Sequence, residues 1–256
     1  MKIALCFSGQ PRFIEQVAPH IIQNVIGDYD VDVFAHLWFD EDLQSKPYKY
    51  GGAGKWKDQR IAPDAIDKFK EIYKPKGIKV EKSRKFLDSN LSDNYQASLK
   101  RYKWGAIDNP DEPNFAVRDV NNIISYYYSL MQVCTLKKEY EHANDFKYDY
   151  VLKIRTDSVV GSKISYEGFP TDMIFYSGNQ SQPDGMINDW FNFGGSKVMD
   201  AFMSAYPVID YCIDQCMEQT DGAWCCELIH RKMIDFFDIK CAALPIHITL
   251  PRFWWK

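Results

Sequence analysis

The groups best suited to chemistry stand where one apolar segment ends. Residues 148–157 begin as a buried strand and finish with Arg155, Thr156 and Asp157. A carboxylate at a sheet edge suits Mg²⁺ or Mn²⁺, which bind one or two protein carboxylates together with substrate phosphates. The guanidinium beside it can hold a phosphate or a hydroxyl. Both side chains face one side of a strand, so a structural Arg155–Asp157 ion pair is the alternative interpretation.

A second group of candidates follows the first apolar segment. Ser8, Gly9 and Arg12 come directly after residues 2–7. Glycine lets the backbone approach a ligand closely, the next helix offers N–H groups, and Arg12 can pair with a phosphate. The Gly-rich fingerprint of dinucleotide sites is absent. A plain strand-to-helix turn is therefore the alternative interpretation.

A third group stands at the end of residues 30–38. His36 and Trp38 are followed by the acidic residues 40–42. A ring beside acids can hold a base or a sugar. The alternative is that Trp38 caps the core and the acids are solvated, as charged loop residues usually are.

Two later carboxylates are candidate general bases. Asp189 precedes a strand rich in aromatic residues, and a carboxylate shielded by rings can accept a proton. Glu227 stands early in a helix, where it also favours the helix dipole. His247 is a candidate ligand for a divalent ion, because a neutral imidazole can coordinate one; a core histidine is the alternative.

These groups require a scaffold of alternating strands and helices, which indicates an α/β domain with a mixed sheet. Because ligands bind outside the carboxyl ends of strands in open α/β sheets, the candidates lie where a site is expected. Residues 40–60 are predicted to be a loop, and residues 83–117 a poorly patterned excursion or lid. Strands are predicted at residues 2–7, 30–38, 77–81, 148–157, 172–176, 190–193, 239–244 and 246–249. Helices are predicted at residues 12–26, 63–73, 119–141, 196–205, 207–218 and 222–236.

Composition narrows the possible partners. The chain has 256 residues and a net charge of −4, which argues against a nucleic acid or an anionic membrane as its partner. Apolar runs stay shorter than the ~20 residues of a membrane span, so no transmembrane segment is expected. An odd number of cysteines, seven, and a start unlike a signal peptide predict free thiols in the reducing cytoplasm. Cys212 and Cys216 have helical spacing, which suits core packing better than zinc binding.

Four segments resemble WavE-like glycosyltransferases of the lipopolysaccharide-synthesis type, which are similar to glycosyltransferase-like proteins of large viruses and phages. The segments are residues 3–12, 32–38, 148–157 and 189–200, in matching order. The resemblance implies a single GT-A-type, Rossmann-like domain over residues 1–256, with a central mixed, mostly parallel sheet flanked by helices. It also implies an enzyme of polysaccharide biosynthesis, viral or bacterial, that moves a sugar from a nucleotide-sugar donor to a glycan, lipopolysaccharide or glycoprotein acceptor.

The resemblance assigns donor-binding roles to residues near the amino-terminal strand and the long helix. Ser8, Gly9 and Arg12 would lie beside the nucleotide. Arg118 and Asn122, at the start of the helix over residues 119–141, would reach the donor sugar or the ribose.

The resemblance also suggests where the reaction takes place. Arg155 and Asp157 would lie beside the diphosphate, and His247 would be a late ligand of a divalent cation, Mn²⁺ or Mg²⁺. Arg155-Thr156-Asp157 stands in place of the family's Asp-x-Asp metal motif, so only the last acid remains. In an inverting transfer, Asp189 would take the proton of the acceptor hydroxyl, with Glu227 as the second candidate.

Two other classes of function remain open. The missing first acid favours a non-catalytic nucleotide- or sugar-binding protein that has kept the fold. An α/β phosphatase or hydrolase acting on phosphorylated small molecules is the other alternative. Fold analogy alone does not choose among them, because function resides in the site.

Overall fold

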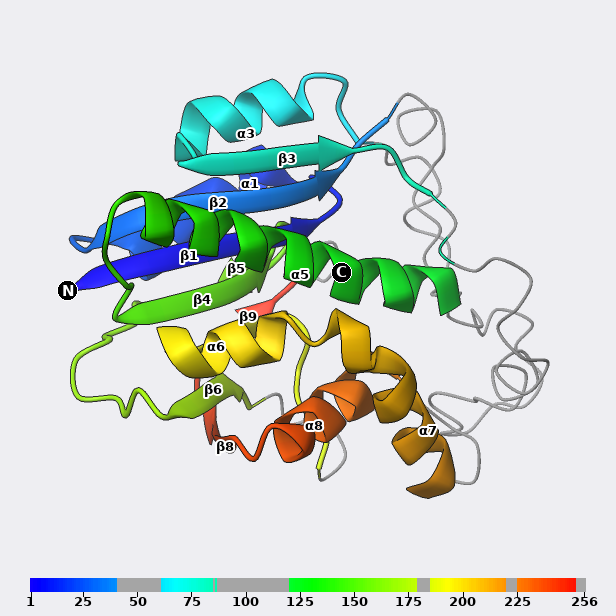
Figure 1. Cartoon of the computed structure of the whole chain (residues 1–256). Coiled ribbons are helices and arrows are strands. Elements are labelled where there is room, and N and C mark those ends of the chain that lie inside the picture. Colours follow the sequence, from blue (N-terminus) through cyan, green and yellow to red (C-terminus); the bar gives the residue numbers. More distant parts are fainter. Residues whose placement is uncertain (41–60, 85, 87–119, 179–184, 220–224, 252–256) are drawn as a thin grey trace.

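A seven-stranded sheet forms the centre of the protein. The computed structural model describes residues 1–40, 61–84, 86, 120–178, 185–219 and 225–251 (Figure 1). The strand order is β3-β2-β1-β4-β7-β6-β8. The strands are β1 (Lys2–Gly9), β2 (Asp30–Trp38), β3 (Gly77–Glu81), β4 (Tyr150–Arg155), β6 (Met173–Ser177), β7 (Phe191–Gly195) and β8 (Lys240–Leu244). This sheet confirms the predicted α/β class.

Six of these strands run in one direction and β7 runs against them. Strands β3, β2, β1 and β4 pair in parallel, and β6 pairs in parallel with β8. Strand β7 lies between β4 and β6 and is antiparallel to both. The order 3-2-1-4 is that of a Rossmann-like sheet, and the antiparallel β7 makes the whole sheet mixed but mostly parallel.

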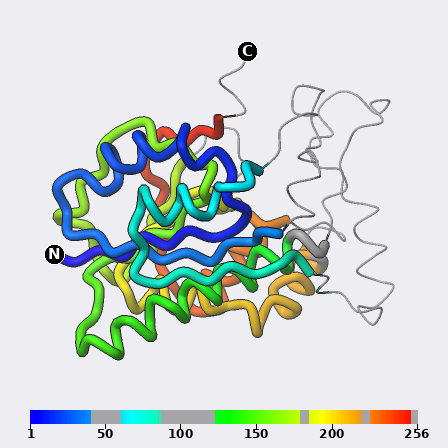
Figure 2. The backbone as a smooth tube through the Cα atoms, turned by 90° about the horizontal axis from the view of Figure 1, so that it is seen from above, coloured from blue at the N-terminus to red at the C-terminus, as the bar shows by residue number. Residues whose placement is uncertain are grey.

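Helices cover both faces of the sheet, as Figure 1 and the view from above in Figure 2 show. On one face lie α1 (Ile14–Ile21), η1 (Ile22–Ile26) and α3 (Ala65–Tyr73). The other face carries α5 (Val120–Ala143), α6 (Ser196–Met203), η2 (Tyr206–Val208), α7 (Ile209–Gln219) and α8 (Cys226–Phe236). The longest helix, α5, crosses β1, β2 and β3.

The alternation of side chains along β1 divides the core into two parts. Ile3, Leu5 and Phe7 pack towards α1 and α3. Ala4 and Cys6 pack towards α5. Successive side chains of a strand point to opposite faces, whereas residues paired across parallel strands point to the same face. Polar residues two positions from Cys6, or paired with such a position or with Cys6 itself, therefore also lie beneath α5. These are the buried side chains Ser8, His36 and Lys153.

The structure differs from the sequence prediction in a few places. The helix predicted over residues 12–26 is α1 followed by the π-helix η1, and Pro19, which has no N–H to donate, stands just before the change. Strand β5 (Val159–Val160) was not predicted, because two residues are too short for a pattern. It pairs with β9 (Ile248–Thr249) in a separate sheet, so only β8 of the two predicted closing strands joins the main sheet.

Two predictions fall almost wholly outside the described residues. The loop at residues 40–60 is described only at residue 40, and the excursion at residues 83–117 only at residues 83, 84 and 86. No helix in the described part of the chain is long and apolar enough to cross a membrane.

The cysteine thiols lie mostly in the core. Six of the seven are buried, and Cys241 is partly exposed. Burial raises the pKa of Cys134 and of Cys212 to about 11, and that of Cys216 to about 12. At neutral pH these thiols are protonated, so they act as apolar packing groups, as the helical spacing of Cys212 and Cys216 indicated.

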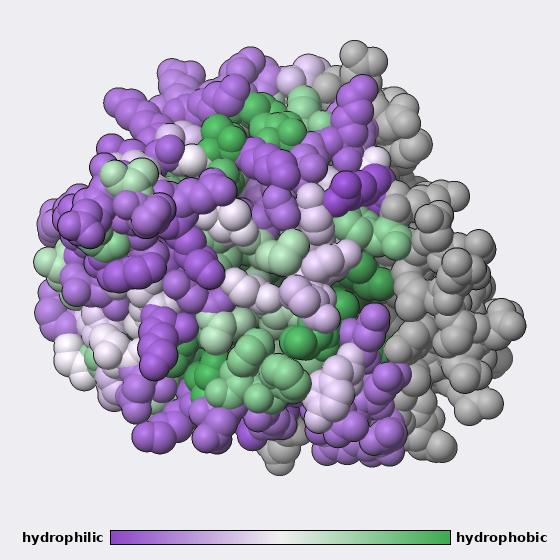
Figure 3. Space-filling model, viewed as in Figure 1, coloured by the Kyte–Doolittle hydropathy of each residue, from purple (hydrophilic) through white to green (hydrophobic). Residues whose placement is uncertain are grey.

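Apolar side chains also reach the surface of the helical layer. Figure 3 shows a mostly hydrophilic face, with apolar residues gathered in its lower part over the region of α6 and α8. Tyr211 and Phe236, from α7 and α8, are about half exposed, and their rings lie 5.3 Å apart. Isolated apolar groups of this kind are normal on a protein surface.

A buried ionic network joins α5 to α6. The Nζ atom of Lys137 lies 3.0 Å from Glu141 Oε1, 2.5 Å from Asp200 Oδ1 and 2.8 Å from Ser196 Oγ. Lys137 and Glu141 are both fully buried. Burial opposes ionisation of Glu141, but the hydrogen bonds from Lys147, from the Tyr148 N–H and from Lys137 prevail, and the pKa of Glu141 is lowered. The network fixes the carboxyl half of α5 on the sheet.

We expect Lys137→Met to lower the free energy of unfolding by about 3–5 kcal/mol, because it leaves buried carboxylates without their cation. Lys138→Met is the matched control, since Lys138 is the next residue of the same helix and is exposed. Its effect should stay within about 0.5 kcal/mol. Urea unfolding of the two variants measures the difference. Equal effects would contradict a stabilising role of the network.

Candidate functional site

The candidate residues gather where the carboxyl ends of β1 and β4 lie side by side, at the arrow tips in Figure 1. From β1 the chain continues to β2 on one side, whereas β4 lies on the other side of β1. Such a change of direction is where open α/β sheets bind ligands. Ser8 of β1 and Arg155 of β4 are neighbours in the register. The antiparallel β7 adds a third segment, because the residues before it arrive at the same edge.

Arg155 bridges two carboxylates. Its Nε and Nη2 atoms each lie 2.9 Å from an oxygen of Asp157, a bidentate pair. Its Nη1 atom lies 3.4 Å from Oδ2 of Asp189. The three side chains are largely buried, which strengthens the attraction between them. The Arg155–Asp157 ion pair is the one that the sequence offered as the structural alternative, and Asp189 extends it.

The turn after β1 is tied to the turn after β4. Thr156 Oγ1 donates a hydrogen bond to the carbonyl of Gln10 and accepts one from the Arg12 N–H at 3.4 Å. Gly9 has a φ of +112°, and no atom lies within 4 Å of the position of a Cβ there. The Ser8 hydroxyl is buried and has no hydrogen-bond partner among the described residues. Ser8, Gly9 and Arg12 thus border Arg155 and Asp157, as the sequence analysis expected.

Behind Asp189 lies a set of buried groups that the sequence analysis missed. The Lys153 ammonium is fully buried and donates to the backbone carbonyl of Asp189. It also lies 4.8 Å from the centre of the Tyr126 ring. Burial lowers the pKa of Lys153 to about 7, against the opposing effect of the Asp189 charge. At neutral pH this lysine is therefore close to its midpoint of protonation.

His230 completes this buried set as a neutral ring. Burial, followed by the charge of Lys153, lowers the pKa of His230 to about 3. Its Nδ1 atom lies 3.3 Å from the carbonyl of Ile187, which can only accept, so Nδ1 carries the proton. Its Nε2 atom then accepts from the Tyr126 hydroxyl at 3.2 Å. That hydroxyl lies 3.5 Å from the Asp189 carbonyl but has only one proton to donate.

The two candidate bases occupy different positions. Asp189 meets Arg155 at the edge of the sheet. Glu227, the second residue of α8, is buried, and its negative charge acts on Lys153 and Tyr126. Asp189 is thus beside the groups expected to hold the diphosphate, whereas Glu227 belongs to the buried set behind it.

Of the three other predicted site residues, the structure describes the side chain of His247 alone. Arg118 lies outside the described residues, and so does the side chain of Asn122, whose backbone belongs to the first turn of α5. His247 is exposed and stands opposite Gly161, whose N–H donates to its carbonyl at 2.9 Å. This places His247 beside the small β5–β9 sheet.

Two carboxylates stand at this edge, those of Asp157 and Asp189, and Arg155 contacts both. Both carboxylate oxygens of Asp157 already accept from Arg155. Within the described ranges, no group of three or more His, Cys, Asp or Glu side chains converges in a way that could hold a metal ion. The divalent cation therefore stays a prediction of the sequence resemblance.

The rings at the end of β2 favour the packing interpretation, whereas two of the three acids, residues 41 and 42, lie outside the described residues. Trp38 is only 5% exposed and stacks on Tyr128, with ring centres 5.7 Å apart. His36 is fully buried, and its ring nitrogens lie 2.7 Å from Ser129 Oγ and from Glu81 Oε2. These side chains anchor α5 to β2 and β3.

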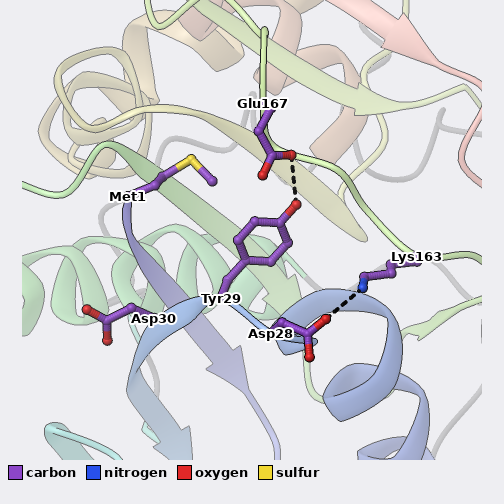
Figure 4. A pocket seen from close by; sticks show the side chains of 6 residues that line it. All are labelled: Met1, Asp28, Tyr29, Asp30, Lys163 and Glu167. Atoms are coloured by element: carbon purple, nitrogen blue, oxygen red, sulfur yellow. Dashed lines mark hydrogen bonds and ion pairs between the residues drawn. The ribbon is translucent and has the colours of Figure 1, made fainter.

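A separate hollow lies near the amino ends of β1 and β2, away from the candidate site at their carboxyl ends (Figure 4). Four of its polar groups are paired with one another: Lys163 with Asp28 at 3.1 Å, and Tyr29 with Glu167 at 2.8 Å. It contains none of the residues predicted to do chemistry. The hollow is lined by Met1, Asp28, Tyr29, Asp30, Lys163 and Glu167.

Comparison with known proteins gives no relative from which a role can be taken. No protein-family model matches the chain, and no curated protein matches it. The chemistry of the site is therefore argued from its own geometry.

The protonation of Lys153 provides a test of the buried set. Unfolded lysine has a pKa of 10.5 and folded Lys153 about 7, so between these values the unfolded chain binds a proton that the folded chain does not. Raising the pH from 7 towards 10 should therefore stabilise the wild type relative to Lys153→Met, by up to about 1.4 kcal/mol per pH unit. Urea unfolding at pH 7, 8 and 9 measures this difference. Parallel pH dependences would show that the ammonium keeps its ordinary pKa.

Proposed function

We propose that the protein is a glycosyltransferase that moves a sugar from a nucleotide-sugar donor to a hydroxyl of a glycan, lipopolysaccharide or glycoprotein acceptor. The observation that carries the proposal is the position of Arg155 between Asp157 and Asp189, at the adjoining ends of β1 and β4. One guanidinium and one carboxylate side by side are the two groups that such a transfer needs.

The donor half of the site is cationic. When the sugar leaves, the bond between its anomeric carbon and the phosphate oxygen breaks, and the nucleoside diphosphate keeps the electron pair. Charge develops on that oxygen, and a fixed guanidinium stabilises it. Arg155 is in place for this role, and Arg12 borders it on the turn that Thr156 holds. Gly9 leaves space for a phosphate to approach the backbone.

The acceptor half of the site is Asp189. In an inverting transfer, the acceptor oxygen attacks the anomeric carbon while its proton passes to a carboxylate. Asp189 lies 3.4 Å from Arg155, so a base and a diphosphate-binding group are neighbours. Glu227 is the weaker candidate, because its charge acts on Lys153 and Tyr126, whereas Asp189 contacts Arg155 directly. This mechanism uses only side chains of the chain itself.

The fold agrees with the proposal. A mostly parallel sheet with Rossmann-like order and one antiparallel strand is compatible with the GT-A-type domain that the resemblance implies. A second function, a nucleotide-binding protein without turnover, is favoured by one observation: Arg155 takes both oxygens of the single acid that remains of the metal motif. Donor turnover distinguishes the two.

The donor is identified by a thermal-shift screen of UDP-, GDP-, CMP- and dTDP-linked sugars. A ligand that binds the folded state stabilises it by about 2.7 kcal/mol at a hundredfold excess over its Kd. We expect a shift with one nucleotide class and a loss of that shift in Arg155→Ala. Repeating the screen with Mn²⁺, on the wild type and on Asp157→Ala, tests the predicted cation. No shift with any donor would contradict the proposed function.

We expect Asp189→Asn to lower kcat by about 10²-fold or more while nucleotide affinity stays nearly constant, because the amide accepts no proton. Glu227→Gln is the matched comparison and should cost much less. Turnover of the donor identified in the screen, measured with acceptor at saturation, gives both values. A larger loss in Glu227→Gln would reverse the assignment of the base.

A further inference from the structure

The loop that carries Asp189 is held by its backbone carbonyls. Four consecutive carbonyls, from Ile187 to Trp190, each accept a hydrogen bond from a group outside the loop. The donors come from several elements: β4, β7, α8 and the turn after β4. They are His230 Nδ1 to Ile187 at 3.3 Å, Asn192 Nδ2 to Asn188 at 3.1 Å, Lys153 Nζ to Asp189, and the Arg155 N–H and Ser158 Oγ to Trp190 at 3.2 and 3.3 Å.

Such anchoring is unusual for a connecting segment. Loops normally run over the surface, where water satisfies their polar groups. Here Asn188 and Asp189 are buried, and the N–H groups of Ile187 and Trp190 are also bonded, to Glu227 O at 3.2 Å and to Asn188 Oδ1 at 2.6 Å. A segment held at this many points has one conformation, and the direction of its side chains is fixed with it.

Lys153 is the donor that acts on Asp189 itself. The Tyr126 hydroxyl lies 3.5 Å from the same carbonyl but gives its proton to His230, so Lys153 is the direct donor among the described residues. Burying an ammonium carries a large desolvation cost, which a neutral amide donor would largely avoid. Burial accordingly lowers the pKa of Lys153 to about 7, and both the charged and the neutral form of its side chain can donate to the carbonyl.

Basic groups lie on either side of the loop. Arg155 is 3.4 Å from the carboxylate of Asp189, and Lys153 donates to its backbone carbonyl. Arg155 thus contacts the carboxylate directly, whereas Lys153 holds the backbone that carries it.

We propose that Lys153 is the positioning residue of the acceptor base: its hydrogen bond to the Asp189 carbonyl fixes the backbone from which the carboxylate faces Arg155. The role of Asp189 as the base rests on the proposed function. The hydrogen bond from Lys153 to the loop is a property of the fold and does not depend on that function. Lys153 contacts no substrate in this scheme. Its influence on the reaction passes through Asp189.

The first arm of the test measures the loop without any substrate. Lys153→Met is compared with Lys137→Met, because both remove the charge of a fully buried lysine and only Lys153 touches the loop. Hydrogen exchange of the amides in residues 185–191 should become faster in Lys153→Met by more than its loss of global stability accounts for, whereas in Lys137→Met any change should follow global stability alone. Lys153→Gln, a neutral residue that still carries a donor, should exchange more slowly than Lys153→Met, because it can form the hydrogen bond to the Asp189 carbonyl again.

The second arm measures turnover and binding under conditions where each variant is folded. In Lys153→Met, kcat should fall by about 10²-fold, the loss typical of a small misplacement of a catalytic group. KM for the donor and the affinity for the nucleoside diphosphate should change less than threefold, because Arg155 and Arg12 remain. Lys137→Met should keep the wild-type kcat.

The outcomes separate this inference from the proposed function. Faster loop exchange together with a lower kcat supports it. Unchanged exchange in residues 185–191, or an unchanged kcat despite faster exchange, overturns it. Wild-type protein that turns over no donor overturns the proposed function instead, and the exchange arm then still decides whether Lys153 fixes Asp189.

Discussion

The antiparallel pairing of β7 with β4 is the constraint on which the site depends. In a parallel arrangement, the residues before β7 would lie at the amino end of β4, a strand length away from Arg155. Instead, the register Ile154–Phe191 brings Trp190 and Asp189 to the end of β4. Gly194 and Gly195 permit the close pairing on the other side, because a Cβ on either would clash with a backbone carbonyl, that of Met173 or Thr171.

The two ends of α5 show two uses of buried charge. At its carboxyl end, Lys137 is matched by Glu141, Asp200 and Ser196, so its desolvation is offset by direct partners. Near its amino end, Lys153 has a carbonyl as its hydrogen-bond acceptor and carboxylates only at longer range, and its pKa falls accordingly. The first arrangement stabilises the fold. The second accepts a cost in stability, which is characteristic of functional sites.

The sequence predicted the elements better than the way they meet. Apolar runs and helical spacing located the strands and helices, and the two-residue spacing of Arg155 and Asp157 offered their ion pair as the alternative to a metal site. The meeting of Arg155 with Asp189 depends on the direction of β7, which no local pattern reveals. The sequence contained a sign of the buried role of Lys153, because a charged residue within an apolar strand is unusual. His230 and Tyr126 stand on helices at spacings that also suit ordinary packing. His247 lies beside Gly161, because β9 pairs with β5 rather than with the main sheet.

On the proposed function, the negative charge of the donor diphosphate affects the protonation of the buried Lys153. Arg155 already contacts two carboxylates, so an incoming diphosphate competes with Asp157 and Asp189 for the same guanidinium. An anion at this edge also favours the charged form of nearby basic groups, and Lys153 titrates near pH 7. By linkage, a ligand that favours the protonated lysine binds more tightly when the lysine is already protonated. On the proposed function, donor binding and protonation of Lys153 therefore favour each other.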